Sequence, residues 1–200
     1  MTKTNQPRPL VRMTETALLI ALIALFSSLP LKVFTLEFTL CTIPVVIGAI
    51  LLGPGTGALL GGVFGLCSFA QCFGWFFPSP FGAALVGINP WYTAIVCLVP
   101  RILMGWLCGW IAYWLRGKKP VLAYGVSCLA GAVLNTVLFT GTLLALFGNT
   151  ELILSLRGDA PLLAFVAVFV GVNGVVEAVV NVVLGTAVAS GLSAMQRRLS

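Results

Sequence analysis

The chain alternates long apolar runs with short stretches rich in proline, glycine and charged residues. Each run has about the length of a membrane-spanning helix, which needs roughly 20 apolar residues. We therefore expect an all-α membrane protein, a bundle of six transmembrane helices. The approximate bounds of these spans are Met13–Leu29, Phe38–Gly53, Thr56–Phe77, Trp91–Leu115, Val121–Phe147 and Leu162–Leu192.

The first apolar run has two possible interpretations. It follows Lys3, Arg8 and Arg12, a basic flank that a cleaved signal peptide also has. No convincing small-residue cleavage site precedes Pro30, and five more runs follow, so we interpret it as a retained helix. The chain is then a single integral-membrane domain over residues 1–200, in which residues 1–12 form a tail.

The composition supports a membrane protein and argues against a nucleic-acid partner. Hydrophobic residues make up 60% of the chain and charged residues 8%, whereas a soluble domain has about 25% charged residues. The formal net charge is +6, but the cations lie at the ends of the apolar runs and do not alternate with aromatic residues along one face. The expected surroundings are the lipid bilayer.

The distribution of the cations predicts the orientation in the membrane. An even number of spans places both termini on one side, and the basic residues concentrate there: Lys3, Arg8, Arg12, Arg116, Lys118, Lys119, Arg197 and Arg198. Cytoplasmic segments carry the excess of Lys and Arg. Both termini, including the tail of residues 1–12, are therefore predicted to be cytoplasmic.

Several chemistries lack the residues that they need. The chain has no His, the commonest base and metal ligand. Its six Cys residues lie in apolar runs without a Cys-x-x-Cys pair, which favours small buried hydrophobic residues over a metal site or disulfides. A phosphate-binding Gly-Lys-Ser/Thr sequence is also missing. We predict no catalytic residues, no metal and no cofactor, and any energy from ATP has to come from a partner.

Polar residues within the apolar runs are the candidate functional residues, because a charge at membrane depth is costly. A rise of about 1.5 Å per residue places Arg101 and Asn135 at a similar level in the outer half of the membrane. Asn173, Glu177 and Asn181 share one face of the last helix. The cluster is a candidate binding site, and the alternative is a structural Arg101–Glu177 ion pair with the Asn side chains as interhelical hydrogen bonds.

Aromatic and small residues add further candidates. Asn89, Trp91 and Tyr92 follow a loop rich in Pro and Gly near the outer side, where they either border the site or form an interfacial belt. Gly57, Gly61 and Gly65 recur every four residues, which favours close helix packing over a pore. Ala17 and Ala21 form an Ala-x-x-x-Ala stripe whose partner is either a neighbouring helix or another subunit.

Several segments resemble a known family. The run Cys41–Pro54, CTIPVVIGAILLGP, resembles the second-helix signature of the substrate-binding (S) components of energy-coupling factor (ECF) vitamin importers. Val99–Gly105 and Leu134–Leu138 resemble the fourth and fifth helices of the pantothenate-type members, and Asn173–Ala178 resembles their sixth. The resemblance covers most of the chain beyond the tail.

The resemblance implies a high-affinity vitamin-binding subunit in a prokaryotic plasma membrane, without an ATPase of its own. Its implied partners are a transmembrane coupling subunit, which Ala17 and Ala21 would contact, and two cytoplasmic ATP-binding subunits. For pantothenate, Arg101 would receive the carboxylate, while Asn135 and Asn173 would serve the amide and hydroxyls. Glu177 would accept from a hydroxyl or orient Arg101.

Other functions stay open at this point. Another S component would bind a different water-soluble vitamin, such as riboflavin or a thiamine precursor. A small intramembrane enzyme would use Glu177 as its base, but no second carboxylate or His is expected at its depth. A channel is suggested only by a faint echo between Gly87–Pro90 and Gly171–Gly174.

Overall fold

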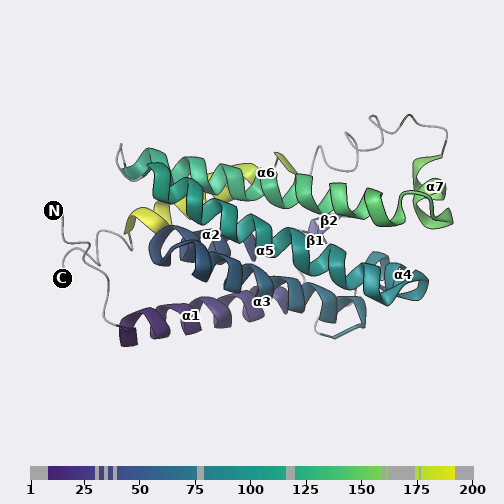
Figure 1. Ribbon diagram of the computed structural model, residues 1–200, viewed down its shortest axis with the longest axis horizontal. Coiled ribbons are helices and arrows are strands. Elements are labelled where there is room, and N and C mark those ends of the chain that lie inside the picture. Colours follow the sequence, from purple (N-terminus) through teal and green to yellow (C-terminus); the bar gives the residue numbers. More distant parts are fainter. Residues whose placement is uncertain are drawn as a thin grey trace.

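The computed structural model describes residues 9–29, 32–33, 36–37, 40–75, 79–115, 120–158, 161, 174–175 and 177–191. These residues form a bundle of nearly parallel and antiparallel helices (Figure 1). The elements are α1 (Pro9–Ser27), β1 (Lys32–Val33), β2 (Leu36–Glu37), α2 (Thr42–Leu52), α3 (Pro54–Cys72), α4 (Pro80–Ile88), α5 (Pro90–Leu115), α6 (Pro120–Phe147), α7 (Glu151–Arg157) and the π-helical segment η1 (Asn181–Gly185). The last segment belongs to an apolar helix over Glu177–Gly191, called here the C-terminal helix.

The long helices agree with the predicted spans. Within the described ranges, four helices are long and apolar enough to cross a membrane: Leu10–Ser27, Pro54–Cys72, Pro90–Leu115 and Val121–Phe147. The second and sixth predicted spans correspond to two shorter helices, α2 and the C-terminal helix. Residues 162–173, the first part of the sixth predicted span, lie outside the described residues, as do residues 1–8 of the tail.

α2 lies in the middle of the bundle. Every residue of this helix except Leu51 is buried, and it packs against α1, α3, α5 and α6. The helix begins at Thr42, four residues after the start of the predicted span at Phe38, because Leu40 and Cys41 form a turn. A small antiparallel hairpin of β1 and β2 lies before this turn. Gly53, with φ of 100°, ends the helix, and Pro54 begins α3 at once. A positive φ favours glycine, so this turn reverses the chain without a loop.

Glycines set the close contact between α3 and α5, the most extensive helix pair of the bundle. A Cβ atom added to Gly57 would overlap the carbonyl oxygen of Gly105, and one on Gly61 would overlap that of Arg101. One on Gly65 would lie 2.8 Å from the carbonyl oxygen of Cys97. The predicted role of these glycines in close helix packing is confirmed, because small residues let two backbones approach in a membrane.

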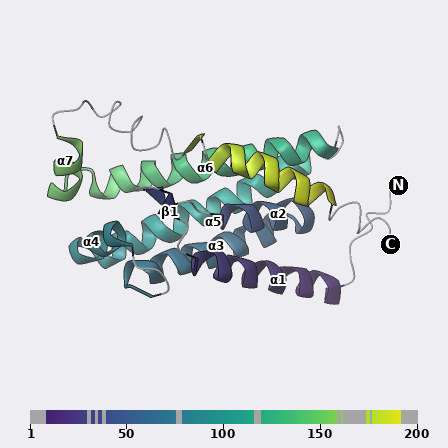
Figure 2. The ribbon, with the colours of Figure 1, turned by 180° about the vertical axis from the view of Figure 1, so that it is seen from behind.

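Two short helices lie together at one end of the bundle (Figure 2). α4 occupies residues 80–88, where the sequence suggested a loop. Ser79 caps this helix by accepting a hydrogen bond from the backbone N–H of Gly82 at 3.3 Å, and Pro80 takes a first-turn position that suits it. α7 begins with Glu151 and ends with Arg157, charges that complement the helix dipole.

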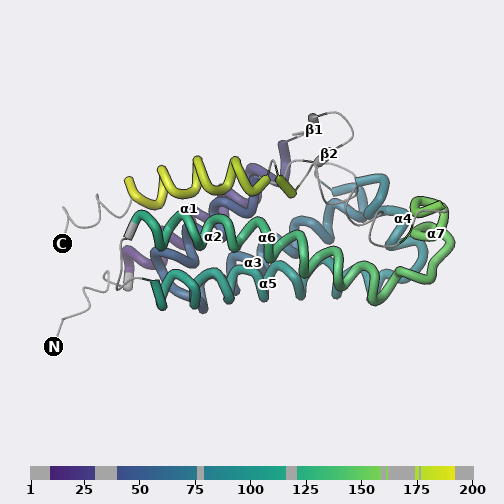
Figure 3. The backbone as a smooth tube through the Cα atoms, turned by 90° about the horizontal axis from the view of Figure 1, so that it is seen from above, coloured from purple at the N-terminus to yellow at the C-terminus, as the bar shows by residue number. Residues whose placement is uncertain are grey.

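The opposite end of the bundle holds the start of α1 and the end of the C-terminal helix (Figure 3). There the Arg12 guanidinium donates to the carbonyl oxygen of Leu52 at 2.9 Å and so caps the C-terminal end of α2. α1 packs on α2 and α3 through buried residues that include Leu19 and Ile23. Ala17 and Ala21 are exposed, so their stripe is on the face of α1 that points away from the bundle.

Candidate functional site

The predicted polar residues meet about halfway along the bundle. Arg101 comes from the middle of α5 and Asn135 from the middle of α6. α2 and the described part of the C-terminal helix lie in the half of the bundle near the termini (Figure 3). Thr42 is the first residue of α2, and Glu177 is the first residue of the range 177–191 that the structure describes. The start of α2 and Glu177 therefore lie beside the centres of the two long helices.

Glu177 connects three helices. Its Oε1 accepts a hydrogen bond from the Thr42 hydroxyl at 2.8 Å and one from the Asn135 side-chain amide at 3.3 Å. Thr42 is completely buried and Asn135 almost so. Because the N-terminal end of a helix carries a partial positive charge, the start of α2 favours the carboxylate of Glu177 beside it. Asn135 and Glu177 were predicted to belong to one polar cluster, and this hydrogen bond joins their side chains.

Arg101 is held by a different set of groups. Its side chain is 8% exposed, and Nη1 donates to the carbonyl oxygens of Cys97 at 2.8 Å and Val96 at 3.4 Å. The guanidinium carbon lies 4.7 Å from the ring centre of Phe64 on α3 and 5.4 Å from that of Phe139 on α6. Both distances are within the range of cation–π attraction. Phe139 follows Asn135 by one helical turn. Arg101, which lies against the Phe139 ring, is therefore at a similar level to Asn135 along the bundle.

Arg101 and Glu177 form no ion pair in the part of the chain that the structure describes. Glu177 bonds to Thr42 and Asn135, whereas Arg101 bonds to the carbonyl oxygens of Val96 and Cys97. The structural ion pair, the alternative that the sequence left open, is therefore not what holds these residues. Arg101, which is buried, and Glu177, which is half-buried, are instead held separately, on α5 and on the C-terminal helix.

Hydrogen-bonding capacity remains at this cluster. Nε of Arg101 and Oδ1 of Asn135 are buried and have no hydrogen-bond partner among the described residues. Asn181, one turn after Glu177, donates to the Glu177 carbonyl oxygen at 2.9 Å, and its Oδ1 has no partner in the same part of the chain. Buried polar groups are nearly always satisfied in native proteins. A donor on Arg101 and an acceptor on Asn135 are what a polar ligand with both kinds of group needs.

The structure does not bring Asn89, Trp91 and Tyr92 to this cluster. Asn89 caps α5, because its Oδ1 accepts from the backbone N–H groups of Trp91 at 3.0 Å and Tyr92 at 3.2 Å. Trp91 is 80% exposed, and Tyr92 makes an edge contact with Phe147 at 6.1 Å. Trp91 lies about 15 Å from Arg101 along α5. These positions fit the interfacial belt better than the site. Asn173 lies outside the described residues.

Three site residues were not predicted from the sequence: Thr42, Phe64 and Phe139. Thr42 precedes Ile43-Pro44 at the start of a helix, which is a capping signal rather than a sign of buried charge. Phe64 lies between Gly61 and Gly65 on α3, so the glycine contact with α5 also brings its ring to Arg101. Phe139 is distinguished only by its spacing of four from Asn135, which places both on one face of α6.

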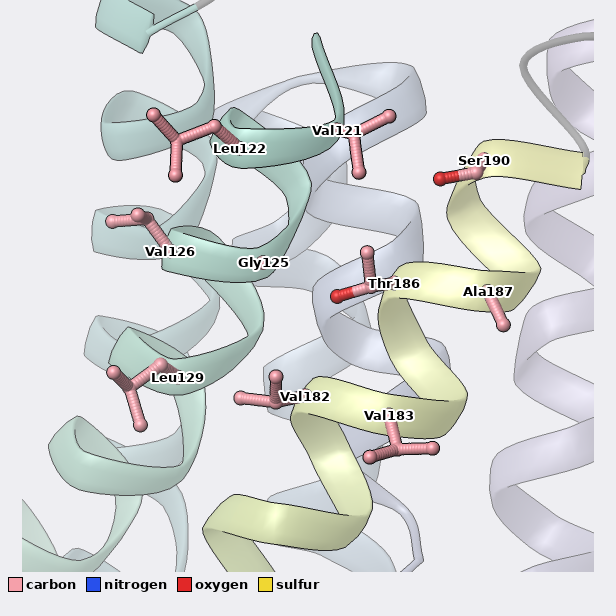
Figure 4. Close-up of a pocket in the computed structure, with 10 residues that line it drawn as sticks. All are labelled: Val121, Leu122, Gly125, Val126, Leu129, Val182, Val183, Thr186, Ala187 and Ser190. Carbon is pink, nitrogen blue, oxygen red and sulfur yellow. The ribbon is translucent and has the colours of Figure 1, made fainter. Parts of the chain in front are cut away.

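A groove of about 880 Å³ lies elsewhere, between α6 and the C-terminal helix (Figure 4). Its walls are apolar except for the hydroxyl groups of Thr186 and Ser190. The lining residues of α6 are Val121, Leu122, Gly125, Val126 and Leu129, between Asn135 and the end of the bundle near the termini. The groove therefore has neither the charges nor the position of the polar cluster, and we do not assign the candidate site to it.

Comparison with known proteins identifies the family. The sequence model of the family described as "ECF transporter, substrate-specific component" matches residues 11–189. The pantothenic acid transporter PanT of Lactococcus lactis is 31% identical over 185 residues, which cover 88% of each chain. The pantothenate transporter PanT of Leuconostoc mesenteroides is 33% identical over 167 residues, covering 80% of this chain and 77% of the relative. The chain therefore belongs to the substrate-specific components of ECF transporters.

Proposed function

We propose that this chain is the membrane-embedded subunit that binds pantothenate for an ECF-type importer. The family supports a role in vitamin uptake, and two relatives are named for transport of this vitamin. The observation that carries the proposal is the arrangement of charge at the polar cluster. Arg101 offers hydrogen-bond donors, while Glu177 and Asn135 offer acceptors, and the two charges are not paired with each other.

Pantothenate has groups that complement both parts of the cluster. Its carboxylate suits the planar guanidinium of Arg101, which binds carboxylates with two parallel hydrogen bonds. Its hydroxyls and amide N–H are donors that suit the Asn135 Oδ1 and the carboxylate of Glu177. Because Arg101 is not tied to Glu177, the ligand carboxylate has no internal ion pair to displace. Asn173, which precedes Glu177 by four residues in the sequence, is a further candidate for the ligand amide.

The alternatives fit this cluster less well. Riboflavin and the pyrimidine precursor of thiamine lack a carboxylate, so neither would supply an anionic partner for Arg101. An intramembrane enzyme would need a second group for acid–base chemistry, but Glu177 is bonded to a Thr and an Asn. The described residues at the cluster are packed between helices, which does not favour a channel.

The proposed setting is a complex in a bacterial plasma membrane. The chain would form one domain with six spans and both termini in the cytoplasm. The positions of α1 and the C-terminal helix, which begin and end at the same end of the bundle, support this topology (Figure 1). The exposed Ala17 and Ala21 would contact a transmembrane coupling subunit, because small residues allow a close approach of helices. Two ATP-binding subunits would complete the transporter.

Thermal unfolding of the detergent-purified protein tests the proposal. Pantothenate at 100 times its Kd should stabilise the folded state by about 2.7 kcal/mol, because it binds only that state. Riboflavin and the thiamine precursor should have no such effect. Arg101→Ala should abolish the response to pantothenate without loss of the folded protein. No response to any vitamin would overturn the proposal, and unchanged binding by Arg101→Ala would make Arg101 structural.

A further inference from the structure

A proline in the middle of α5 lies directly beside the buried arginine. Pro100 is inside the helix and buried. It has no backbone N–H, so the carbonyl oxygen of Val96, four residues earlier, loses the donor that an α-helix normally supplies. In a membrane that carbonyl has no water to bond to, and an unsatisfied backbone group there is costly.

The side chain of Arg101 supplies the missing donor. Its Nη1 lies 3.4 Å from the Val96 oxygen and 2.8 Å from the Cys97 oxygen, so it bridges two successive carbonyls. Helical side chains lean toward the N-terminus of the helix, which brings Nη1 to these oxygens. The Phe64 and Phe139 rings lie against the same guanidinium. The two carbonyl oxygens and the two rings together restrict the orientation of the Arg101 guanidinium.

The bonds of Nη1 leave the Nε edge of the Arg101 guanidinium available to bind another group. Within the ranges that the structure describes, both of its hydrogen bonds come from Nη1, and the buried Nε has no partner. We propose that Pro100 is a positioning residue, which frees the Val96 carbonyl so that Arg101 is held with its Nε edge ready for the ligand carboxylate. This inference rests on the proposed function in naming the carboxylate of pantothenate as that ligand group.

Positioning of this kind raises affinity because the ordering of a flexible side chain is completed before the ligand binds. In Pro100→Ala the new N–H bonds to the Val96 oxygen, and Nη1 loses one of its two acceptors. The variant should fold with an unchanged or higher Tm, since a helix-interrupting residue is removed. The guanidinium should then sample several orientations, and only interactions that depend on Arg101 should weaken.

Calorimetry with two ligands separates positioning from a general structural effect. The ligands are pantothenate and pantothenol, in which an alcohol replaces the carboxylate. Pro100→Ala should bind pantothenate roughly tenfold more weakly, the loss expected when a binding-competent orientation falls to about a tenth of the population, and pantothenol with little change. Val99→Ala, on the exposed side of the same turn, is the matched control and should alter neither affinity. Equal losses for both ligands, or no loss for either, would overturn the inference.

A measurement without ligand distinguishes this inference from the proposed function. Nitrogen NMR of arginine side chains should show separate Nη signals for Arg101 in the parent protein, because its Nη1 is held, and averaged signals in Pro100→Ala. Arg101→Lys assigns the signals by their loss. Identical spectra of the parent and Pro100→Ala would overturn the positioning role. Failure of the parent protein to bind pantothenate would instead overturn the proposed function, and with it the assigned ligand.

Discussion

Substituting Gly61 by Ala should destabilise the bundle at the contact of α3 with α5. The added Cβ would overlap the Arg101 carbonyl oxygen and lie 2.8 Å from its carbonyl carbon and 3.2 Å from the Cα of Ile102. All three atoms belong to the backbone, so no side-chain rotation relieves the overlap. The two helices have to separate by at least about half an ångström, a gap at which dispersion attraction already falls by a quarter or more.

Gly62→Ala is a matched control in the same helix turn. Its Cβ would meet only the side chain of Ile102, at 3.7 Å and 3.9 Å, which is ordinary contact. Both substitutions remove the conformational freedom of glycine in a helix, a gain of about 0.5–1 kcal/mol each. That gain cancels between the two variants, so their difference in stability reports the overpacking, which costs about 1–3 kcal/mol.

Thermal unfolding in one detergent, followed by tryptophan fluorescence, measures this difference. For a chain of this size, 1 kcal/mol corresponds to a change in Tm of about 2–4 °C. Gly61→Ala should therefore unfold roughly 2–12 °C below Gly62→Ala, with Gly62→Ala at or above the parent protein. Equal Tm values for the two variants would refute the backbone contact between α3 and α5.

Three further predictions concern the site and its surroundings. Thr42→Val removes the hydroxyl that donates to Glu177 and should weaken pantothenate binding roughly 3- to 20-fold, the scale of an interhelical hydrogen bond in a membrane. Thr142→Val, whose hydroxyl bonds only within α6, should leave calorimetric affinity unchanged, and an equal loss in both variants would contradict the role of Thr42. The Sγ atoms of Cys72 and Cys97 lie 3.9 Å apart, so mild oxidation with copper phenanthroline should join them in a disulfide. After denaturation, both thiols should then be protected from alkylation, while Cys108 should still react. Alkylation of Cys72 and Cys97 would show that α3 and α5 are packed differently here. Ala17→Trp or Ala21→Trp should abolish vitamin uptake in cells but preserve calorimetric binding, since both residues are exposed on α1, and normal uptake would exclude this face as the contact with the coupling subunit.

The long helices could be predicted from the sequence because length, apolar character and punctuation by Pro or Gly all agree there. α5 and α6 begin within one residue of the predicted spans and end where expected. α2 was predicted to begin too early, since Phe38–Leu40 continue the apolar run although Leu40 and Cys41 form a turn. The prolines and glycines around Ser79 indicate a loop, but Ser79-Pro80 is also a signal for the start of a helix, and α4 begins there.

The candidate site could be predicted in its level but not in its contacts. Counting residues along helices placed Arg101 and Asn135 at a similar level, since a helix has a fixed rise. The spacing of four placed Glu177 and Asn181 on one face of the last helix. Which side chains bond to each other depends on their rotamers and on competing partners, and spacing along the sequence does not encode either. The Thr42 hydroxyl donates a hydrogen bond to Glu177. The guanidinium of Arg101 bonds to the carbonyl oxygens of Val96 and Cys97, although electrostatic attraction alone would direct it toward the Glu177 carboxylate.

The glycine contact between α3 and α5 has a consequence for how such proteins diversify. Where two backbones touch, there is no side chain to exchange, so mutation at Gly57, Gly61 or Gly65 has almost no neutral outcomes. Under the proposed function, a lineage that acquires a new ligand preference would do so through Thr42, Asn135, Glu177 and their neighbours on the other helices. Gly57, Gly61 and Gly65 would then be inherited nearly unaltered, while selection acts on the residues of the polar cluster.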